Sequence, residues 1–257
     1  MGDELLCTVA DGVATVTLNR PAKRNALSRA LLDGLRAAFE RLEGDPAVRV
    51  VVVRGNGPAF CSGMDLDELS RQQEAHVDPE GSVVTVLRRI EQCRHPTLAV
   101  VHGDAFAGGC ELALHCDLRL AAEHARFAMP LARLGLVVPF PLGQKLVEIV
   151  GPAMTREILM VGRPLTARRA YEIGMVHEVV PADAIDRAAG ELARTIAANA
   201  PLSLRGMKRT ILRAVAAREG IDHADLDALA AQARRSRDAK EGVRAMLEKR
   251  TPDFRGE

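Results

Sequence analysis

The pattern of apolar and polar residues near the start of the chain predicts two strands followed by a helix. Residues 5–10 and 13–18 are strand-like and flank Asp11-Gly12, a dipeptide typical of two-residue hairpin turns because it tolerates positive φ. Apolar residues then recur at helical spacing over 27–42. Ser28 is a suitable N-cap, since its hydroxyl can accept a hydrogen bond from a free N–H of the first turn.

The same alternation continues through the middle of the chain. The β-branched run from Val48 to Val53 is typical of a strand that is buried on both faces. It ends in a strong loop signal, and the elements expected afterwards are a helix over 83–93, a strand over 97–101, a helix over 109–115 and a strand over 117–121. Strands and helices in alternation predict an α/β layer architecture. No repeat is evident in the sequence, and the GxGxxG dinucleotide fingerprint is missing.

Helices are predicted to dominate from about Gly151 onward. We interpret Asp238 and Glu241 as a capping-box-like pair at the start of the last helix. That helix carries one apolar stripe, which consists of Ala239, Val243, Met246 and Leu247. The chain is therefore expected to form a mixed core over residues 1–195 and a helical C-terminal region over residues 196–257.

Composition and charge exclude several classes of function. Hydrophobic residues make up 47% of the 257 residues, so a sizeable core can form, but aromatic residues contribute only 3%. Few aromatic side chains argue against base-stacking platforms for nucleic acid. The formal net charge of +1 argues against a general nucleic-acid or membrane-surface binder, because such proteins are usually more basic.

The cysteines and the start of the chain bear on metal binding and location. The five cysteines include no CxxC pair, so we expect neither a zinc site nor a disulfide framework. The first residues lack the charged-then-apolar pattern of a signal peptide, and no apolar run approaches the roughly 20 residues of a membrane span. We expect a cytoplasmic protein without a bound metal.

Two glycine-containing loops are the candidates for chemistry. Residues 59–66 and 103–113 each follow a buried strand and are rich in small residues where the chain turns toward a helix. Such turns present free main-chain N–H groups, and two of them pointing at one oxygen would form an oxyanion hole. Each loop taken alone is better explained as an ordinary strand-to-helix turn that needs glycine for positive φ.

Several segments in a fixed order resemble the crotonase superfamily, the enoyl-CoA hydratase/isomerase family, along nearly the whole chain. They are residues 19–27 (NRPAKRNAL), 59–66 (AFCSGMDL), 103–114 (GDAFAGGCELAL), 116–119 (CDLR), 163–167 (RPLTA), 174–176 (GMV) and 248–254 (EKRTPDF). The resemblance implies a crotonase-like spiral of ββα turns with C-terminal trimerisation helices. It also implies a homotrimer or a dimer of trimers and a role in fatty acid metabolism. No permanently bound cofactor is implied, since coenzyme A enters as part of the thioester substrate.

The resemblance also implies roles for particular residues. The N–H groups of Cys61 and Gly108 would hold the thioester oxygen, and Glu111 would act as acid and base. Standing alone, an acidic residue such as Glu111 in a first helical turn is more often a complement to the helix dipole. Lys23 and Arg24 are candidates for the phosphates of coenzyme A, although they also read as a solvated surface. The substrate-binding set implied by the resemblance is Ala22, Lys23, Arg24, Ala59, Ser62, Gly63, Met64, Leu131, Phe140, Lys249 and Phe254.

One departure from the family pattern affects the expected reaction. Leu131 stands where a hydratase of this family carries its second glutamate, and leucine can neither donate nor accept a proton. Residues 136–143 contain two prolines and Phe140, which suggests a stiff, apolar wall. Family resemblance alone assigns an enoyl-CoA hydratase. The alternatives are a double-bond isomerase or another enolate enzyme that needs only one carboxylate, and a non-catalytic acyl-CoA-binding protein.

Overall fold

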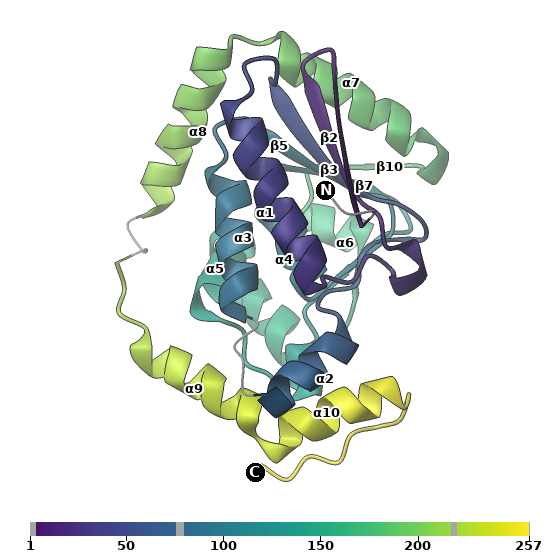
Figure 1. Ribbon diagram of the computed structural model, residues 1–257, viewed down its shortest axis with the longest axis vertical. Helices are drawn as coiled ribbons and strands as arrows, with labels where there is room; N and C mark the ends of the chain where they lie inside the picture. The colour runs from purple at the N-terminus through teal and green to yellow at the C-terminus, as the bar shows by residue number, and fades with distance from the viewer. Residues whose placement is uncertain (1–3, 76–79, 217–219, 257) are drawn as a thin grey trace.

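The fold was analysed in a computed structural model that describes residues 4–75, 80–216 and 220–256 (Figure 1). Ten strands form two sheets, with the order β1-β2-β3-β5-β7-β10 in the larger and β4-β6-β8-β9 in the smaller. The larger sheet contains β1 (Leu5–Ala10), β2 (Val13–Leu18), β3 (Val50–Gly55), β5 (Thr97–Val101), β7 (Leu118–Ala122) and β10 (Glu178–Val180). The smaller contains β4 (Ala59–Cys61), β6 (Asp104–Phe106), β8 (Arg126–Ala128) and β9 (Leu165–Thr166).

The two sheets are built by a repeated ββα unit. In each unit the first strand joins the larger sheet, the second joins the smaller, and a helix follows. The units are β3-β4 with α2 (Leu66–Ala75) and α3 (Glu80–Gln92), β5-β6 with α4 (Gly108–Leu114), and β7-β8 with α5 (Phe140–Arg156). This arrangement confirms the predicted α/β spiral, although the repeat is not visible in the sequence.

The amino-terminal elements agree with the sequence pattern. Strands β1 and β2 pair antiparallel around Asp11 and Gly12, whose φ values of 50° and 80° are those of a tight hairpin turn. Helix α1 spans Arg29–Gly44, and the Ser28 hydroxyl accepts a hydrogen bond from the N–H of Leu31. The predicted turn and cap are both confirmed.

Two apolar layers cover the larger sheet. Alternate residues of its central strands, such as Val51 and Ala99, point into a core shared with helices α1 and α3. The residues between them, such as Val52 and Leu98, pack against α7 (Ile185–Ala198) on the other face. The central strands are thus buried on both faces, as their continuous apolar runs predict. Figure 1 shows α1 and α7 on opposite sides of the sheet.

The C-terminal half differs from the sequence prediction in detail. Helix α5 begins at Phe140, ahead of the expected position, and is interrupted at Gly151, where φ is 71°. Strand β10, which the sequence analysis missed, pairs with β7 at the edge of the larger sheet. The capping-box interpretation is wrong, because the N-cap of α10 (Arg237–Leu247) is Ser236, which accepts a hydrogen bond from the N–H of Ala239.

After α7 the described elements are the helices α8 (Pro201–Val215), α9 (Ala224–Arg235) and α10. Helix α10 packs against α2 and against the short η2 helix (Leu131–Leu134). On α8, the side chains of Leu202 and Met207 are 80% and 62% exposed. The boundary at residue 195 between the mixed core and the helical region stays a prediction. Assembly into a homotrimer or a dimer of trimers also stays a prediction.

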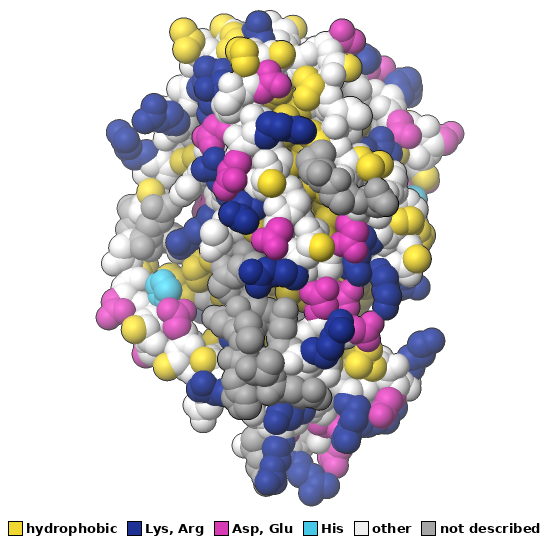
Figure 2. Space-filling view, viewed as in Figure 1, with side chains coloured by type: hydrophobic (Ala, Val, Ile, Leu, Met, Phe, Trp, Pro, Cys, Tyr) yellow, Lys and Arg dark blue, Asp and Glu magenta, His cyan; other side chains and the backbone are white. Residues whose placement is uncertain are grey.

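The surface carries charges of both signs, which intersperse over the face shown in Figure 2. Several Lys and Arg side chains gather at its lower end, where α10 and the C-terminus lie in the matching view of Figure 1. Within residues 4–75, 80–216 and 220–256, no helix combines the length and hydrophobicity that a membrane span requires.

Candidate active site

The two glycine-containing loops meet at one edge of the smaller sheet. Strands β4 and β6 are parallel neighbours, so their carboxyl ends lie side by side. Gly63 after β4 has φ of 96°, and a Cβ placed there would lie 3.0 Å from the Phe106 carbonyl oxygen and 3.4 Å from the Gly108 nitrogen. A Cβ placed on Gly108 would lie 3.8 Å from the Met64 nitrogen. The loops therefore touch at their backbones.

The first loop is attached to the segment that precedes α1. The Ser62 N–H donates to the Arg24 carbonyl at 3.0 Å, the Leu27 N–H to the Gly63 carbonyl at 2.7 Å, and the Asp65 N–H to the Leu27 carbonyl at 3.1 Å. These bonds engage the Gly63 carbonyl, just before Met64, and the Asp65 N–H, just after it. The Met64 N–H itself donates no hydrogen bond to any residue that the structure describes.

The second loop is shaped by a strained residue, Ala107. Its φ of 47° and ψ of −120° are unusual for a side chain with a Cβ, and such a conformation costs about 1–3 kcal/mol. Its N–H donates to the Ala128 carbonyl at 2.7 Å, which fixes the turn. Gly108 follows as the first residue of α4, and its N–H has no partner among the described residues. The sequence analysis did not single out Ala107, since alanine gives no signal for positive φ.

Cys61 lies below this meeting point. It pairs with Ala105 in the ladder between β4 and β6, and it is fully buried. Burial raises the pKa of its thiol to about 12, so the thiol is neutral. The sequence suggested Cys61 and Gly108 as the two N–H donors. Gly108 lines the cavity described next, whereas Cys61 is not among its lining residues. Met64, three residues after Cys61, is in the lining.

The loops form one wall of a cavity of about 560 Å³. This volume is in the usual range for small-molecule sites. Most of the lining side chains are apolar, and those from α2, α3, η2, α5 and α10 include Leu69, Val83, Leu131, Leu142 and Met246. Leu131, which replaces the second carboxylate of the family pattern, is half-buried in this lining. The cavity therefore surrounds the two loops with a mainly hydrophobic environment.

Glu111 borders the cavity from the first turns of α4. Its side chain has no exposed surface, so the carboxyl group lies under the cavity wall. Neither carboxyl oxygen has a hydrogen-bond partner in the described part of the chain. Burial raises the pKa of Glu111 well above its usual range, and the positive charge of Lys145 opposes this shift only in part. A buried carboxyl without a partner is a group prepared for proton transfer.

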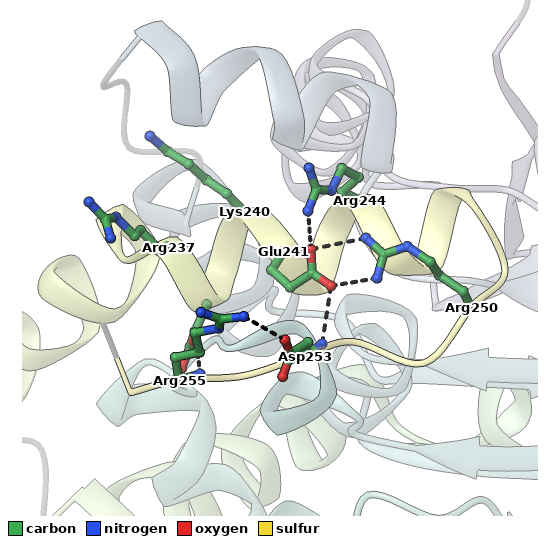
Figure 3. A pocket seen from close by; sticks show the side chains of 8 residues that line it. Arg237, Lys240, Glu241, Arg244, Arg250, Asp253 and Arg255 are labelled. Atoms are coloured by element: carbon green, nitrogen blue, oxygen red, sulfur yellow. Dashed lines mark hydrogen bonds and ion pairs between the residues drawn. The ribbon is translucent and has the colours of Figure 1, made fainter.

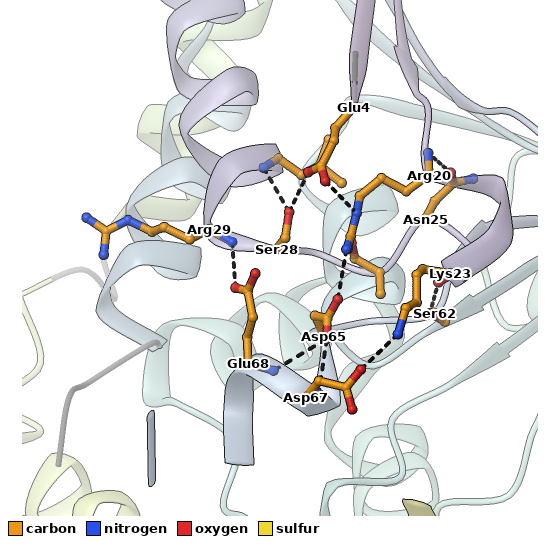
Figure 4. A network of polar contacts seen from close by, with 12 residues as sticks. Glu4, Arg20, Lys23, Asn25, Ser28, Arg29, Ser62, Asp65, Asp67 and Glu68 are labelled. Atoms are coloured by element: carbon orange, nitrogen blue, oxygen red, sulfur yellow. Dashed lines mark hydrogen bonds and ion pairs between the residues drawn. The ribbon is translucent and has the colours of Figure 1, made fainter. Parts of the chain in front are cut away.

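The other two carboxylates at the cavity are already bound (Figure 4). Asp65 accepts a hydrogen bond from the Arg20 guanidinium at 2.9 Å and caps α2 through the N–H groups of Asp67 and Glu68. Asp67 pairs with the Lys23 ammonium at 2.8 Å. Asp65 is thus the helix cap that its position after the loop suggests, and Glu111 differs from both in having no cation beside it.

The remaining predicted residues fall into two groups. Lys23, Arg24 and Ser62 line the cavity, and Gly63 lies against Gly108. The described lining does not include Ala22, Ala59, Phe140, Lys249 or Phe254. Phe140 starts α5 and stacks on His223 with ring centroids 4.8 Å apart, so it does not form the expected wall. Pro139, Leu136 and Leu142 form that wall instead. The sequence analysis also missed Arg133 of η2, which is among the lining residues.

A second pocket, of about 680 Å³, lies between α10 and the C-terminal tail (Figure 3). Its central carboxylate, Glu241, accepts hydrogen bonds from Arg244, Arg250 and the N–H of Asp253. Asp238 binds the N–H groups of Arg255 and Gly256. These carboxylates hold the tail against the helix, and their oxygens are engaged by these donors.

The structure offers little for a metal ion. Among the described residues, no three His, Cys, Asp or Glu side chains come together as a possible metal site. All five cysteines are free, and four of them are buried.

Comparison with known proteins identifies the family. Residues 8–257 match the sequence profile of Enoyl-CoA hydratase/isomerase. The chain is 35% identical over 256 residues to the 2,3-dehydroadipyl-CoA hydratase of Escherichia coli (strain K12), covering 98% of this chain and 99% of the relative. It is 38% identical over 250 residues to a putative enoyl-CoA hydratase of Thermus thermophilus, covering 94% and 97%.

Solved structures share the fold over the whole chain. A methylmalonyl-CoA decarboxylase complexed with 2S-carboxypropyl-CoA superposes with a TM-score of 0.91 at 25% identity, over 100% of both chains. An enoyl-CoA hydratase from Mycobacterium avium subsp. paratuberculosis superposes with a TM-score of 0.82 at 29% identity, over 98% of both chains. The extent of these matches shows that this protein belongs to the enoyl-CoA hydratase/isomerase (crotonase) family, whose members are enzymes that act on acyl-CoA substrates.

Proposed function

We propose that the protein forms and reprotonates the enolate of an acyl-CoA thioester with one carboxyl group. The N–H groups of Met64 and Gly108 hold the thioester oxygen, and Glu111 moves the proton. Met64 takes the place that the sequence analysis gave to Cys61. The observation that carries the proposal is that two unused main-chain N–H groups lie where the two loops touch, in the lining of the same cavity as a buried carboxyl without a hydrogen-bond partner among the described residues.

The two amides are suited to charge that develops during the reaction. Enolisation moves negative charge onto the thioester oxygen, and donors already fixed in an apolar site stabilise it without reorganisation. The strain at Ala107 and the hydrogen bonds around Met64 hold the donors in place. Loss of one such donor typically costs on the order of 100- to 1000-fold in rate.

A single carboxyl favours double-bond isomerisation over hydration. Glu111 as carboxylate can remove a proton from one carbon of the substrate and return it to another, which needs no second group. Hydration requires one group to activate water and another to protonate carbon. Leu131 provides neither function, and the other carboxylates of the lining, Asp65 and Asp67, are paired with Arg20 and Lys23. Hydration remains the activity that the names of the sequence relatives suggest.

Decarboxylation is a second candidate, favoured by the raised pKa of Glu111. In loss of CO2 from a malonyl-type thioester, the bond between the carboxylate and the α-carbon breaks, and its electron pair forms the enolate. That reaction needs no base, only an oxyanion hole and an acid that protonates the α-carbon. Glu111 is such an acid because burial favours its neutral form. The structural similarity to a methylmalonyl-CoA decarboxylase supports the same reading.

For the coenzyme A part of the substrate, Lys23 and Arg24 remain the candidates for its phosphates. Lys23 is exposed and must exchange its ion pair with Asp67 for a phosphate. Lys249 and Phe254 stay predictions as additions from the tail. A cytoplasmic location, a role in fatty acid metabolism and a trimeric assembly are likewise part of the proposal.

A panel of three thioesters distinguishes the reactions. Wild type and Glu111→Gln are incubated with a 2-enoyl-CoA, a 3-enoyl-CoA and a malonyl-type CoA, and the products are identified by mass spectrometry. If wild type isomerises the 3-enoyl thioester and Glu111→Gln does not, the result supports the isomerase. Loss of CO2 from the malonyl-type thioester supports the decarboxylase. Equal rates for both variants on a genuine substrate would remove Glu111 from the mechanism.

A further inference from the structure

His115 is a buried side chain for which the proposed reaction has no role so far. It lies one turn after Glu111, at the end of α4, and its side chain is 2% exposed. Its Nδ1 is 2.8 Å from the main-chain oxygen of Glu111 and 3.7 Å from the carboxyl atom Oε2 of the same residue. Because a carbonyl oxygen can only accept, Nδ1 carries the proton of the neutral ring. An N–H therefore stands directly beside the Glu111 carboxyl.

Apart from Glu111, the charged groups around His115 are not part of the cavity lining. The ring is not part of the cavity lining, and the charges that act on it are those of Lys145 and Glu148 on α5 and Arg119 on β7. The Lys145 ammonium is 2.8 Å from Glu148 and is also bound by Glu91 of α3. Glu148 and Glu91 are 28% and 20% exposed. Titratable groups thus extend from the sealed Glu111 to the solvent behind α4.

A route on this side matters because a bound substrate covers the cavity side of Glu111. The carboxyl has no surface exposed to bulk solvent, and an acyl chain in the cavity would exclude water from it. A carboxyl with no other contact could only return the proton that it had just removed. An N–H donor on the other side of Glu111, connected to solvent through titratable groups, would let the carboxyl exchange that proton with water.

We propose, on the basis of the proposed function, that His115 is a relay residue that exchanges protons between the Glu111 carboxyl and the solvent behind α4. In the delivering direction the Nδ1–H bond breaks and an O–H bond forms on the Glu111 carboxylate. In the same step Nε2 takes a proton from the solvent side, where the charges of Lys145 and Glu148 act on the ring, so no charged ring forms and the ring is neutral before and after. The reverse sequence removes a proton from Glu111. The ring need only turn from one oxygen of Glu111 to another.

Neutral imidazole is the form that this route requires. Burial and the nearby Lys145 and Arg119 lower the pKa of His115 to about 4, so the ring is uncharged at neutral pH. An uncharged ring can accept at one nitrogen while it donates from the other. A permanent imidazolium would instead form an ion pair with Glu111 and hold its proton in place.

The test compares solvent exchange with turnover in His115→Asn. Asparagine can keep a donor near the position of Nδ1, but it cannot pass a proton from one side to the other. Butyryl-CoA is incubated in D2O, and deuterium at the α-carbon is measured by mass spectrometry. Exchange should fall by at least about tenfold in the variant, because the carboxyl then returns its own proton. Isomerisation of a 3-enoyl-CoA, which can use that internal return, should change much less.

Two controls separate this proposal from the proposed function and from misfolding. His177→Asn changes a histidine whose pKa is also lowered to about 4 but which lies near Arg119 and not beside Glu111, so exchange should stay at the wild-type level. His115→Gln serves if the asparagine variant does not fold. Glu111→Gln must abolish both exchange and isomerisation, otherwise the proposed function fails. If Glu111→Gln is inactive while His115→Asn and His115→Gln exchange like wild type, or if wild type isomerises without exchange, the relay is disproved.

Discussion

Two glutamates in two pockets show how differently one side chain can be used. Glu241 in the C-terminal pocket binds Arg244, Arg250 and the N–H of Asp253, and these contacts hold its pKa well below the usual range. Glu111 in the other pocket has neither an arginine nor a main-chain amide on its carboxyl, and burial shifts its pKa in the opposite direction. The surroundings of Glu241 stabilise its charged form, whereas the surroundings of Glu111 destabilise its charged form.

The comparison teaches that charge does not locate the chemistry. The C-terminal pocket is the more highly charged, yet its acids are saturated with donors. The other pocket is mainly apolar and contains one carboxyl whose oxygens have no hydrogen-bond partner among the described residues. A group that is fully hydrogen-bonded holds structure together, whereas a buried group without partners can exchange protons.

The largest expected effect comes from the same substitution made in both pockets. Glu111→Gln should lower turnover of an enolisable acyl-CoA by about 100- to 10000-fold, because it removes the acid–base group and keeps its shape. Glu241→Gln should leave turnover close to wild type. Steady-state kinetics of both variants on one substrate measure the difference. Comparable losses in the two variants would contradict the separation of roles.

A methyl group between the two main-chain donors should have the next largest effect. Gly108 has no positive φ, so alanine can adopt its backbone. In Gly108→Ala the new Cβ would stand 3.1 Å from Leu27 Cδ1 and 3.8 Å from the Met64 nitrogen. A displacement of about 1 Å at the oxyanion site should reduce kcat about 100-fold. Gly206→Ala, a helical glycine with open space around it, is the control and should keep full activity.

The two glutamates should give opposite pH dependences of stability. Glu111 has a raised pKa in the folded state, so its contribution to the free energy of unfolding is complete below the ordinary value of 4.5 and is lost as pH rises through the raised value. Glu241 has a lowered pKa, so its contribution is present above that value and is lost as pH falls.

Urea unfolding of both amide variants at about pH 5 and about pH 8 measures this contrast. The free energy of unfolding of wild type should fall relative to that of Glu111→Gln when the pH is raised from the lower to the higher value. The difference between wild type and Glu241→Gln should instead stay constant over this interval and shrink only at more acidic pH. The same sign for both variants would refute the assignment.

The smallest effect should be confined to the C-terminal tail. Glu241→Gln weakens the ion pairs that bind Arg250 and the N–H of Asp253, so the tail should detach more often. Limited proteolysis should then cleave the tail faster than in wild type, with global unfolding almost unchanged. Glu248→Gln, which also removes an Arg250 partner but leaves Glu241 in place, should show a weaker change.

Much of the fold and part of the site could be predicted from local sequence. The hairpin at Asp11-Gly12, the cap at Ser28 and the doubly buried strands follow from turn chemistry and from the spacing of apolar residues. Gly108 and Glu111 were identified because family resemblance applies to positions within a continuous motif. Phe140 was misplaced because its ring packs on His223, a contact between segments far apart in the chain.

The sequence by itself determined the family, the alternation of strands and helices, and the candidate carboxyl at position 111. Only the tertiary structure decided which amides stay unused, because that depends on hydrogen bonds between loops and not on residue type. The bonds from residues 24–27 to residues 62–65 leave Met64 available, and the torsion angles of Ala107 turn the chain at Gly108. It likewise decided that the Glu111 carboxyl has no hydrogen-bond partner in the described part of the chain while Glu241 has three, since burial and pairing are properties of the packed chain.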